Sequence, residues 1–286
     1  GVICDLDARA EGGLVTTGHR VAVLTPGDLH GRNADRAAVA GTWGPGGLAD
    51  RVRPRHQVLH DVLDFEARSH HNHALDALRL HATRREAVEE ELRATAAVIA
   101  ATLREDCTTW VAAANHDEHL DRWVREADWR RDPVNAAFLL DAAREAVAAV
   151  TEGRPAHLAP WALRRAGVPA SVRFLARDER LELAGVRHDL HGDLGPNGAR
   201  GSGRNLARLA DKVVIGHAHT AGIVGGAYQV GTFSRLDLPY VRGPSSWSHT
   251  AALTYDTGKR TLLTLRGGRY GADAPAPDLE ALACLD

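Results

Sequence analysis

Short apolar runs recur along the chain, and several of them are followed at once by a cluster of aspartate and histidine. Residues 21–24, 56–59, 108–111 and 213–215 each have the length and the apolar or β-branched content of a buried strand. Side chains just past the ends of such strands lie on one rim of a sheet, where layered and open α/β folds place functional groups. The pattern therefore predicts a sheet whose rim carries the aspartates and histidines.

The spacing of apolar residues becomes helical between these runs. Residues 74–104 place leucine, valine and isoleucine among arginines and glutamates at intervals that predict one long helix or a pair of helices. Residues 118–127 and 134–150 have the same amphipathic character. We interpret residues 118–167 as a helical insertion between two parts of the sheet region.

The last third of the chain is typical of strands with one short helix. Residues 171–175 and 181–183 flank a polar turn and predict a β-hairpin. Residues 228–230 and 251–265 predict further strands, the second segment folding back at an Asp-Thr-Gly turn, and residues 205–209 predict a short helix. Helical and strand blocks in this order predict an α/β fold, a layered β-sandwich flanked by helices.

The length of 286 residues fits one large domain. We expect a catalytic domain over residues 18–272, preceded by a segment at 1–17 and followed by a tail at 273–286. Methionine is absent from the chain, even at position 1. We therefore expect a trimmed form or one part of a longer product, with residues 1–17 as the tail of an upstream part.

Charge, cysteine content and the absence of a long apolar run limit the partners and the cell compartment that we expect. The net charge of -2 indicates that the protein as a whole is not basic, so a nucleic acid would have to bind to a local basic patch. Cys4, Cys107 and Cys284 are widely spaced without a CxxC pair, which argues against a disulfide framework and a thiolate zinc site. No apolar run reaches the roughly 18 to 20 residues of a membrane span, and no signal peptide opens the chain. We expect a soluble cytoplasmic protein without a membrane partner.

The polar clusters after the strands contain every ligand type that two adjacent divalent ions need. In chain order they are Asp28-Leu29-His30, His60-Asp61-Val62-Leu63-Asp64, Asn115-His116-Asp117, His191-Gly192-Asp193 and Gly216-His217-Ala218-His219. Two ions about 3.5 to 4 Å apart lower the pKa of a shared water and neutralise charge on a phosphoryl group, which is what phosphoester hydrolysis requires. Mixed oxygen and imidazole ligands suit Mn²⁺, Fe, Zn²⁺ or Ni²⁺ better than Ca²⁺.

This ordered set resembles the calcineurin-like metallophosphoesterases, whose pattern is DxH, GDxxD, GNH[DE], H and GHxH. The resemblance implies two divalent ions, manganese first, with iron, zinc, nickel or magnesium as alternatives, and Asp61 as the carboxylate that bridges them. The implied ligands are Asp28, His30, Asp61 and His219 for one ion, and Asp61, Asn115, His191 and His217 for the other.

The same resemblance implies roles for residues beside the metals. His116 would stand next to the scissile phosphate, where it would stabilise the transition state or protonate the leaving oxygen, with Asp117 fixing its tautomer, while Asp64 would orient a ligand. Two positions depart from the family pattern. His60 replaces the glycine before the bridging aspartate, and Ala114 replaces the glycine before Asn-His. Neither change removes a ligand.

Candidate residues for a substrate phosphate lie in two other stretches. Arg68 and His71 follow the Asp61 cluster, although the run of histidines there also fits a polar helix start. Arg200 and Arg204 belong to a glycine-rich stretch that could receive an anion or serve as a connector. A second glycine-rich stretch, residues 41–47, has the composition of a turn-forming loop that could border a substrate groove.

Short motifs in three segments, residues 60–73, 191–204 and 217–249, resemble a phage branch of this superfamily, the pre-early metallophosphatases linked to host DNA degradation and DNA transfer. That resemblance implies DNA as the substrate and a bacterial or infected host cytoplasm as the location. We therefore predict a metal-dependent phosphodiesterase, a hydrolase acting as a DNase. The alternatives are a phosphomonoesterase or phosphoprotein phosphatase, and a DNA-binding or regulatory protein whose metal site is structural.

One surface feature would separate these hypotheses. A long groove lined by arginines would favour a nuclease, because several arginines in a row can each contact a phosphate of a nucleic-acid strand. A closed pocket would favour a phosphomonoesterase with a small substrate. The arginines considered for such a groove are Arg32, Arg36, Arg51, Arg53, Arg55, Arg200 and Arg204. The sequence leaves the oligomeric state open.

Overall fold

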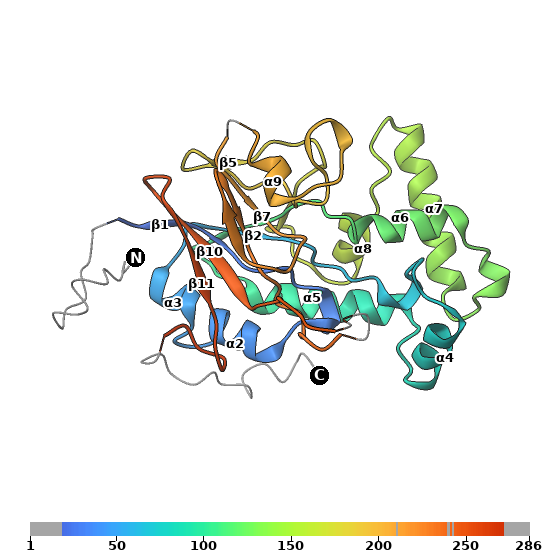
Figure 1. The fold of residues 1–286 in the computed structure, drawn as a ribbon. Coiled ribbons are helices and arrows are strands. Elements are labelled where there is room, and N and C mark those ends of the chain that lie inside the picture. The colour runs from blue at the N-terminus through green and yellow to red at the C-terminus, as the bar shows by residue number, and fades with distance from the viewer. Residues whose placement is uncertain (1–18, 210, 239–240, 242, 272–286) are drawn as a thin grey trace.

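The computed structural model describes residues 19–271 apart from 210, 239–240 and 242. The predicted N-terminal segment at 1–17 and the predicted tail at 273–286 lie outside these residues. The described part of the chain contains two mixed β-sheets with helices around them, so the predicted α/β class is confirmed (Figure 1).

The first sheet has six strands in the order β11-β10-β1-β2-β3-β4. Its strands are β1 (Val21–Thr25), β2 (His56–Leu59), β3 (Thr108–Val111), β4 (Arg173–Phe174), β10 (Thr250–Tyr255) and β11 (Arg260–Thr264). Strands β1 to β4 run parallel, and β10 and β11 add antiparallel strands beside β1. The carboxyl ends of β1, β2 and β3 therefore share one edge.

The second sheet has five strands in the order β5-β6-β7-β9-β8. Its strands are β5 (Glu182–Leu183), β6 (Val186–Arg187), β7 (Val213–Ile215), β8 (Gly222–Val224) and β9 (Ala227–Gln229). Strands β6, β7 and β9 are parallel, with β5 and β8 antiparallel at the two edges.

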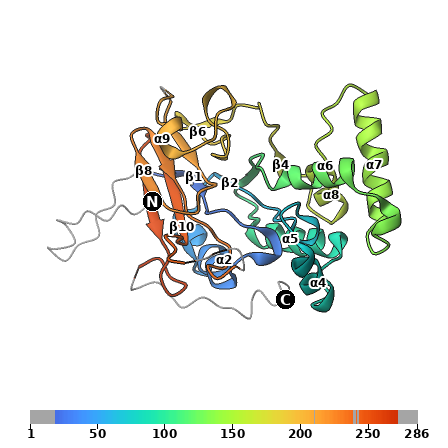
Figure 2. The ribbon, with the colours of Figure 1, turned by 45° about the vertical axis from the view of Figure 1, so that its right-hand side comes forward.

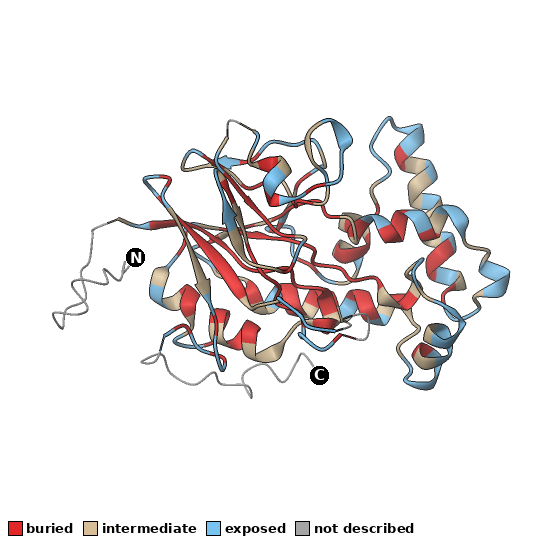
Figure 3. Cartoon of the chain, in the orientation of Figure 1, coloured by how far each residue is buried: buried red, intermediate tan, exposed pale blue. Residues whose placement is uncertain are grey.

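Apolar side chains between the sheets hold them face to face. Val23 and Val58 of the first sheet share a buried cluster with Leu181, next to β5, and Val214 of β7 shares another with Ala252 of β10. Helices cover the outer faces, so the order of layers is helix, sheet, sheet, helix. Figure 3 shows buried residues following the strands through the middle of the molecule, with exposed residues gathered on the outer turns and helices.

Most helices of the described region cover the first sheet and extend beyond one end of it (Figure 2), whereas α9 packs against the second sheet. They are η1 (Gly31–Asn33), α2 (Arg36–Trp43), α3 (Leu48–Val52), η2 (Glu66–Arg68), α4 (Ala74–Ala82), α5 (Val88–Thr102), α6 (Asp117–Glu126), η3 (Trp129–Arg131), α7 (Ala136–Thr151), α8 (Ala159–Arg165), η4 (Pro196–Gly198) and α9 (Gly203–Leu206). Residues 74–104 thus form a pair of helices, and residues 118–167 are largely helical. In the part of the chain that is described, no helix combines the length and apolar character needed to cross a membrane.

The predicted hairpin over residues 171–183 is wrong. Strand β4 pairs with β3 in the first sheet, while β5 pairs with β6 in the second. Leu175 and Leu181 are both buried in the cluster between the sheets, and the Leu175 amide donates to the Val111 carbonyl at 2.9 Å. The segment therefore crosses from the first sheet to the second, with both leucines buried between them.

The predicted loop over residues 41–47 is also wrong in its first half. Gly41, Thr42 and Trp43 form the last turn of α2. Trp43 is buried, and its indole Nε1 donates to Gln57 Oε1 at 2.8 Å. Gly41 lies so close to the Gly268 carbonyl that a Cβ would not fit. The first half of this stretch therefore packs into the protein, and a groove beside residues 44–47 stays a prediction.

Candidate metal centre

The ends of parallel strands from both sheets meet at one rim and bring the predicted ligands together. Asp28 follows β1, Asp61 follows β2 and His217 follows β7. Backbone hydrogen bonds join these loops, because the His30 amide donates to the Asp61 carbonyl at 2.9 Å and the Gly216 amide donates to the His191 carbonyl at 2.7 Å. The positions of the side chains are therefore set by the backbones of two sheets.

Asp28, His30, Asp61 and His219 form the tightest group. One ligand atom of each lies within 4.8 Å of the others, and all four residues are buried. His30 Nε2 lies 2.9 Å from His219 Nε2 and 3.6 Å from Asp61 Oδ2. His219 Nε2 lies 3.3 Å from Asp28 Oδ2. These are the four residues that the family resemblance implies for one ion.

One histidine of the second predicted set also lies next to Asp61. His191 Nε2 lies 3.6 Å from Asp61 Oδ2, and the rings of His191 and His217 are 5.3 Å apart between centroids. The Asn115 Oδ1 atom is buried. Asp61 Oδ2 thus lies 3.6 Å from a histidine of each set, the placement that a bridging carboxylate requires.

Unpartnered buried atoms show that these residues fit a cation. Asp28 Oδ1, Asp61 Oδ1, Asn115 Oδ1 and both ring nitrogens of His191 are buried without a hydrogen-bond partner. Such atoms are rare in folded proteins, and each one calls for a missing partner. Carboxylate oxygens, an amide oxygen and one nitrogen of a neutral imidazole present lone pairs, so a divalent metal ion would satisfy them together. The arrangement could hold metal ions but does not fix their number or identity.

The two central carboxylates differ in their ionisation. Burial raises the pKa of Asp61 well above its usual range, and the negative charge of Asp28 adds to this effect, against the opposing influence of His116. Burial would also raise the pKa of Asp28, but the imidazoles of His191 and His219 hold it below its usual range. Two buried carboxylates this close need compensating positive charge, which a bound cation would supply.

Backbone strain is concentrated at the same rim. Nine non-glycine residues with positive φ occur in the described region, and four of them are His30, Asp61, His217 and His219, with φ of 53°, 47°, 73° and 57°. Conformations of this kind are costly and tend to occur at functional sites. Gly216 is required here for space, because a Cβ would collide with Asp28 Oδ1. The strained backbone lets side chains from successive loops converge.

His116 lies at the start of α6 with its ring between two aspartates. Its Nδ1 lies 3.2 Å from Asp64 Oδ1, and its Nε2 lies 3.9 Å from Asp61 Oδ2. Burial favours the neutral ring, but the two carboxylates outweigh it and raise the pKa of His116 to about 10. Asp64 Oδ1 also lies 3.1 Å from His30 Nδ1, and Asp64 Oδ2 accepts from Asn33 Nδ2 at 2.6 Å. Asp64 therefore orients both rings.

The predicted role of Asp117 is wrong. Its Oδ2 accepts a hydrogen bond from the Ala114 amide at 3.2 Å, so its carboxylate turns back toward the backbone at the first residue of α6. Burial raises the pKa of Asp117 to about 6. The position beside the His116 ring belongs to Asp64. His30, Asp64 and His116 are themselves close enough to form a group that could hold a metal.

Three further side chains lie at the site, and the sequence predicts no role at the metal centre for any of them. His60 is fully buried, stacks on His191 with ring centroids 5.7 Å apart and has no partner for either nitrogen. Trp247 presents an edge to the His219 ring at 4.3 Å. His119 lies on α6 with its ring 4.7 Å from that of His116. The replacement of a glycine by His60 was the one sequence signal that pointed to any of them.

The structure contradicts a phosphate-binding role for Arg68. Its Nε and Nη2 donate to the two carboxylate oxygens of Asp132 at 2.6 and 2.7 Å, and its Nη1 donates to the carbonyls of Ala67 and Glu86. Arg32 is similarly engaged, because its Nη2 lies 3.7 Å from both Glu66 and Glu91. These arginines brace the loops behind the site and do not line a groove.

Arg200 and Arg204 are exposed on the glycine-rich segment after His191. This segment is internally bonded, since the Gly201 amide donates to the Asp193 carbonyl at 2.8 Å and the Ser202 hydroxyl caps α9. His71 is exposed on the turn before α4. Phosphate binding by these three residues stays a prediction.

Comparison with known proteins gives one relative. No protein-family model matches the chain, and no solved structure matches it. The chain is 36% identical over 283 residues to Protein A1 of Escherichia phage T5, an alignment that covers 95% of this chain and 50% of the relative. It thus spans about half the length of the curated relative that it matches. Homology to a phage protein and a buried cluster of histidine and aspartate together fit a metal-dependent enzyme.

Proposed function

We propose that the chain is a metal-dependent phosphodiesterase that hydrolyses DNA. The observation that carries the proposal is the convergence on Asp61 of aspartate and histidine side chains from four other loops, in the chain order of the metallophosphoesterase motifs. Phosphoester hydrolysis needs metal ligands and a proton donor. A mixed carboxylate and imidazole centre beside a protonated histidine provides both.

The ligand assignment follows the two groups around Asp61. Asp28, His30, Asp61 and His219 would hold one ion, while Asp61, Asn115, His191 and His217 would hold the other. Bound there, divalent ions supply a water of lowered pKa and positive charge against the phosphoryl oxygens. Asp61 would hold the two ions next to each other, because it is the one side chain assigned to both ligand sets.

His116 is the candidate proton donor. Its Nδ1 faces Asp64, so its Nε2 is the atom that faces the centre, 3.9 Å from Asp61 Oδ2. The aspartates favour the charged ring, which keeps a proton on Nε2 for the leaving oxygen of the ester. Asp64 fixes the tautomer and the orientation of the ring. The imidazolium also places positive charge beside the phosphate site.

DNA is the proposed substrate on two grounds. Arg200 and Arg204 are exposed on the segment that leaves His191, where they could contact phosphates beyond the scissile one. The motifs around residues 60–73, 191–204 and 217–249 resemble the phage branch linked to DNA degradation. A small monoester would need the metal centre alone and would gain nothing from these arginines.

Parallel hydrolysis assays test the proposal. Labelled DNA, bis(4-nitrophenyl) phosphate and 4-nitrophenyl phosphate are each incubated with Mn²⁺, Mg²⁺ or EDTA, using the wild type, Asp61→Ala and the exposed control Asp178→Ala. We expect DNA cleavage with Mn²⁺ that is lost with EDTA and in Asp61→Ala but retained in Asp178→Ala. Hydrolysis of the monoester alone would identify a phosphomonoesterase. Bound metal without any hydrolysis would identify a structural site.

A further inference from the structure

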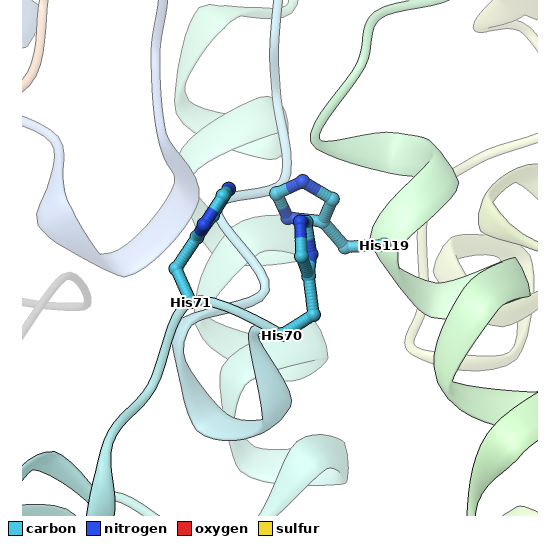
Figure 4. Close-up of side chains that lie close together, drawn as sticks. All are labelled: His70, His71 and His119. Atoms are coloured by element: carbon cyan, nitrogen blue, oxygen red, sulfur yellow. The ribbon is translucent and has the colours of Figure 1, made fainter.

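A second histidine group lies outside the Asp61 centre. One ring nitrogen from each of His70, His71 and His119 lies within 4.8 Å of the others. Figure 4 shows His70 and His71 side by side on the loop before α4, with His119 reaching toward them from α6. The three rings come from two elements that are separate in the sequence.

The rings pack closely without carboxylate partners. The centroids of His70 and His71 are 3.8 Å apart, and the His70 ring meets the edge of His119 at 4.7 Å. Within the described residues, no carboxylate forms an ion pair with any of the three histidines. Near His70 the charges of Arg122 and Glu126 offset each other, because the arginine Nε donates to the glutamate at 3.1 Å.

His119 has a nitrogen that needs a partner. The residue is only 9% exposed, and its Nδ1 is buried without a hydrogen bond. Burial first, and then the neighbouring imidazoles, lower the pKa of His119 to about 3. His119 is therefore neutral, and a neutral imidazole has one nitrogen with a free lone pair. A neutral, buried imidazole whose nitrogen has no partner, with two further imidazoles beside it, calls for a cation.

We propose that His70, His71 and His119 bind a further divalent transition-metal ion, with Zn²⁺ as the best match, in a site distinct from the Asp61 centre. Three imidazole nitrogens with one open position form a ligand set that zinc takes. Mn²⁺ and Mg²⁺ prefer oxygen ligands and have none here. The inference does not depend on the proposed DNase activity.

The geometry allows the site to close around an ion. Zinc binds imidazole nitrogen at about 2.0 to 2.1 Å, and nitrogens that lie within 4.8 Å of one another need at most small ring rotations to meet at one ion. His119 is buried and anchors the site, while His70 and His71 are exposed on a turn and have room to rotate. The ring of His119 lies 4.7 Å from that of His116, so the ion would border the proposed proton donor.

The number of zinc ions bound per chain tests the proposal directly. Protein preloaded with Mn²⁺ is titrated with Zn²⁺, passed through a desalting column and analysed for zinc per chain by mass spectrometry. The variants are His70→Ala/His71→Ala and, as a matched control, His73→Ala/His81→Ala, which removes two exposed histidines from the same stretch. All three proteins keep the Asp61 centre, so any exchange of metal there is common to them.

We expect the His70→Ala/His71→Ala variant to retain one zinc ion fewer per chain than the wild type, and the control variant to match the wild type. Circular dichroism checks that the fold is kept, as the two exposed positions lead us to expect. Equal zinc content in the two double variants would overturn the proposal. Asp61→Ala is measured in the same way. If the additional zinc ion is lost in Asp61→Ala but kept in His70→Ala/His71→Ala, the ion belongs to the Asp61 centre, and the proposal is overturned.

Discussion

The two histidine groups of this protein are held in different ways. The Asp61 centre takes its side chains from the ends of strands in two sheets, and Asp28, His30 and Asp61 are each at most 1% exposed. The outer group takes two exposed histidines from a turn and one buried histidine from a helix. Backbone geometry fixes the first group, whereas side-chain rotation adjusts the second.

The two groups also differ in charge. The Asp61 centre contains carboxylates that are poorly compensated without a cation, and the outer group consists of imidazoles without a carboxylate. Carboxylate-rich sites favour Mn²⁺ and related ions, and imidazole sites favour zinc. In our two proposals, one centre serves the chemistry of a phosphoester and the other binds an ion beside it. Substitutions that separate metal binding from turnover test this division.

The largest effect is expected for Asp61→Ala. The carboxylate faces both predicted ligand sets, so its loss should remove metal from both positions and abolish hydrolysis, well beyond the roughly 10- to 100-fold cost of losing an outer partner of a ligand. Metal analysis and DNA cleavage are measured together. Asp178→Ala, an exposed aspartate, should behave as the wild type. Full metal content in Asp61→Ala would show that Asp61 is not the bridge.

His116→Ala should separate chemistry from metal binding. We expect turnover to fall by about 10² to 10⁴-fold, the usual contribution of a positioned acid or base, while metal content and DNA binding persist. Single-turnover rates and metal analysis of the same preparation provide the comparison. Loss of metal in this variant would make His116 a ligand and would remove its role as proton donor.

Asp64→Ala should have a smaller effect. Asp64 contacts the rings of both His30 and His116, so its removal should lower activity by about 10- to 100-fold with metal content largely kept. Asp64→Asn keeps a hydrogen-bond acceptor and should lose less. Metal loss as complete as in Asp61→Ala would instead make Asp64 a ligand, as its grouping with His30 and His116 allows.

The smallest effect is expected for Arg200→Ala/Arg204→Ala. Each lost phosphate contact should remove roughly one unit from the slope of affinity against salt, so KM for DNA should rise and its salt dependence should flatten. Hydrolysis of bis(4-nitrophenyl) phosphate should barely change. The exposed arginines Arg93 and Arg144, replaced together, provide the control. Equal losses on both substrates would place Arg200 and Arg204 in the reaction centre.

The strands and the ligand clusters could be predicted because both are local in the sequence. An apolar run of four or five residues followed by aspartate or histidine marks a strand and its end, as at β1 with Asp28 and at β2 with Asp61. Parallel strands then bring their carboxyl ends to one edge. The pairing of strands is not local, which is why residues 171–183 were mistaken for a hairpin.

The partners of individual side chains could not be predicted for the same reason. Asp64, rather than the neighbouring Asp117, reaches His116 because the chain turns back after β2, where Phe65 has a φ of 56°. Arg68 meets Asp132, 64 residues further along the chain. His119 meets His70 only because α6 lies next to η2. Each of these contacts depends on packing between distant segments.

The positions of bound ions test the central claim most directly. Crystals of the protein loaded with Mn²⁺ are measured at the manganese absorption edge, and anomalous scattering locates the ions. The account predicts two peaks about 3.5 to 4 Å apart, as in other dinuclear sites, with the Asp61 carboxylate between them. Manganese away from Asp61, or no manganese among Asp28, His30, His191 and His219, would contradict it.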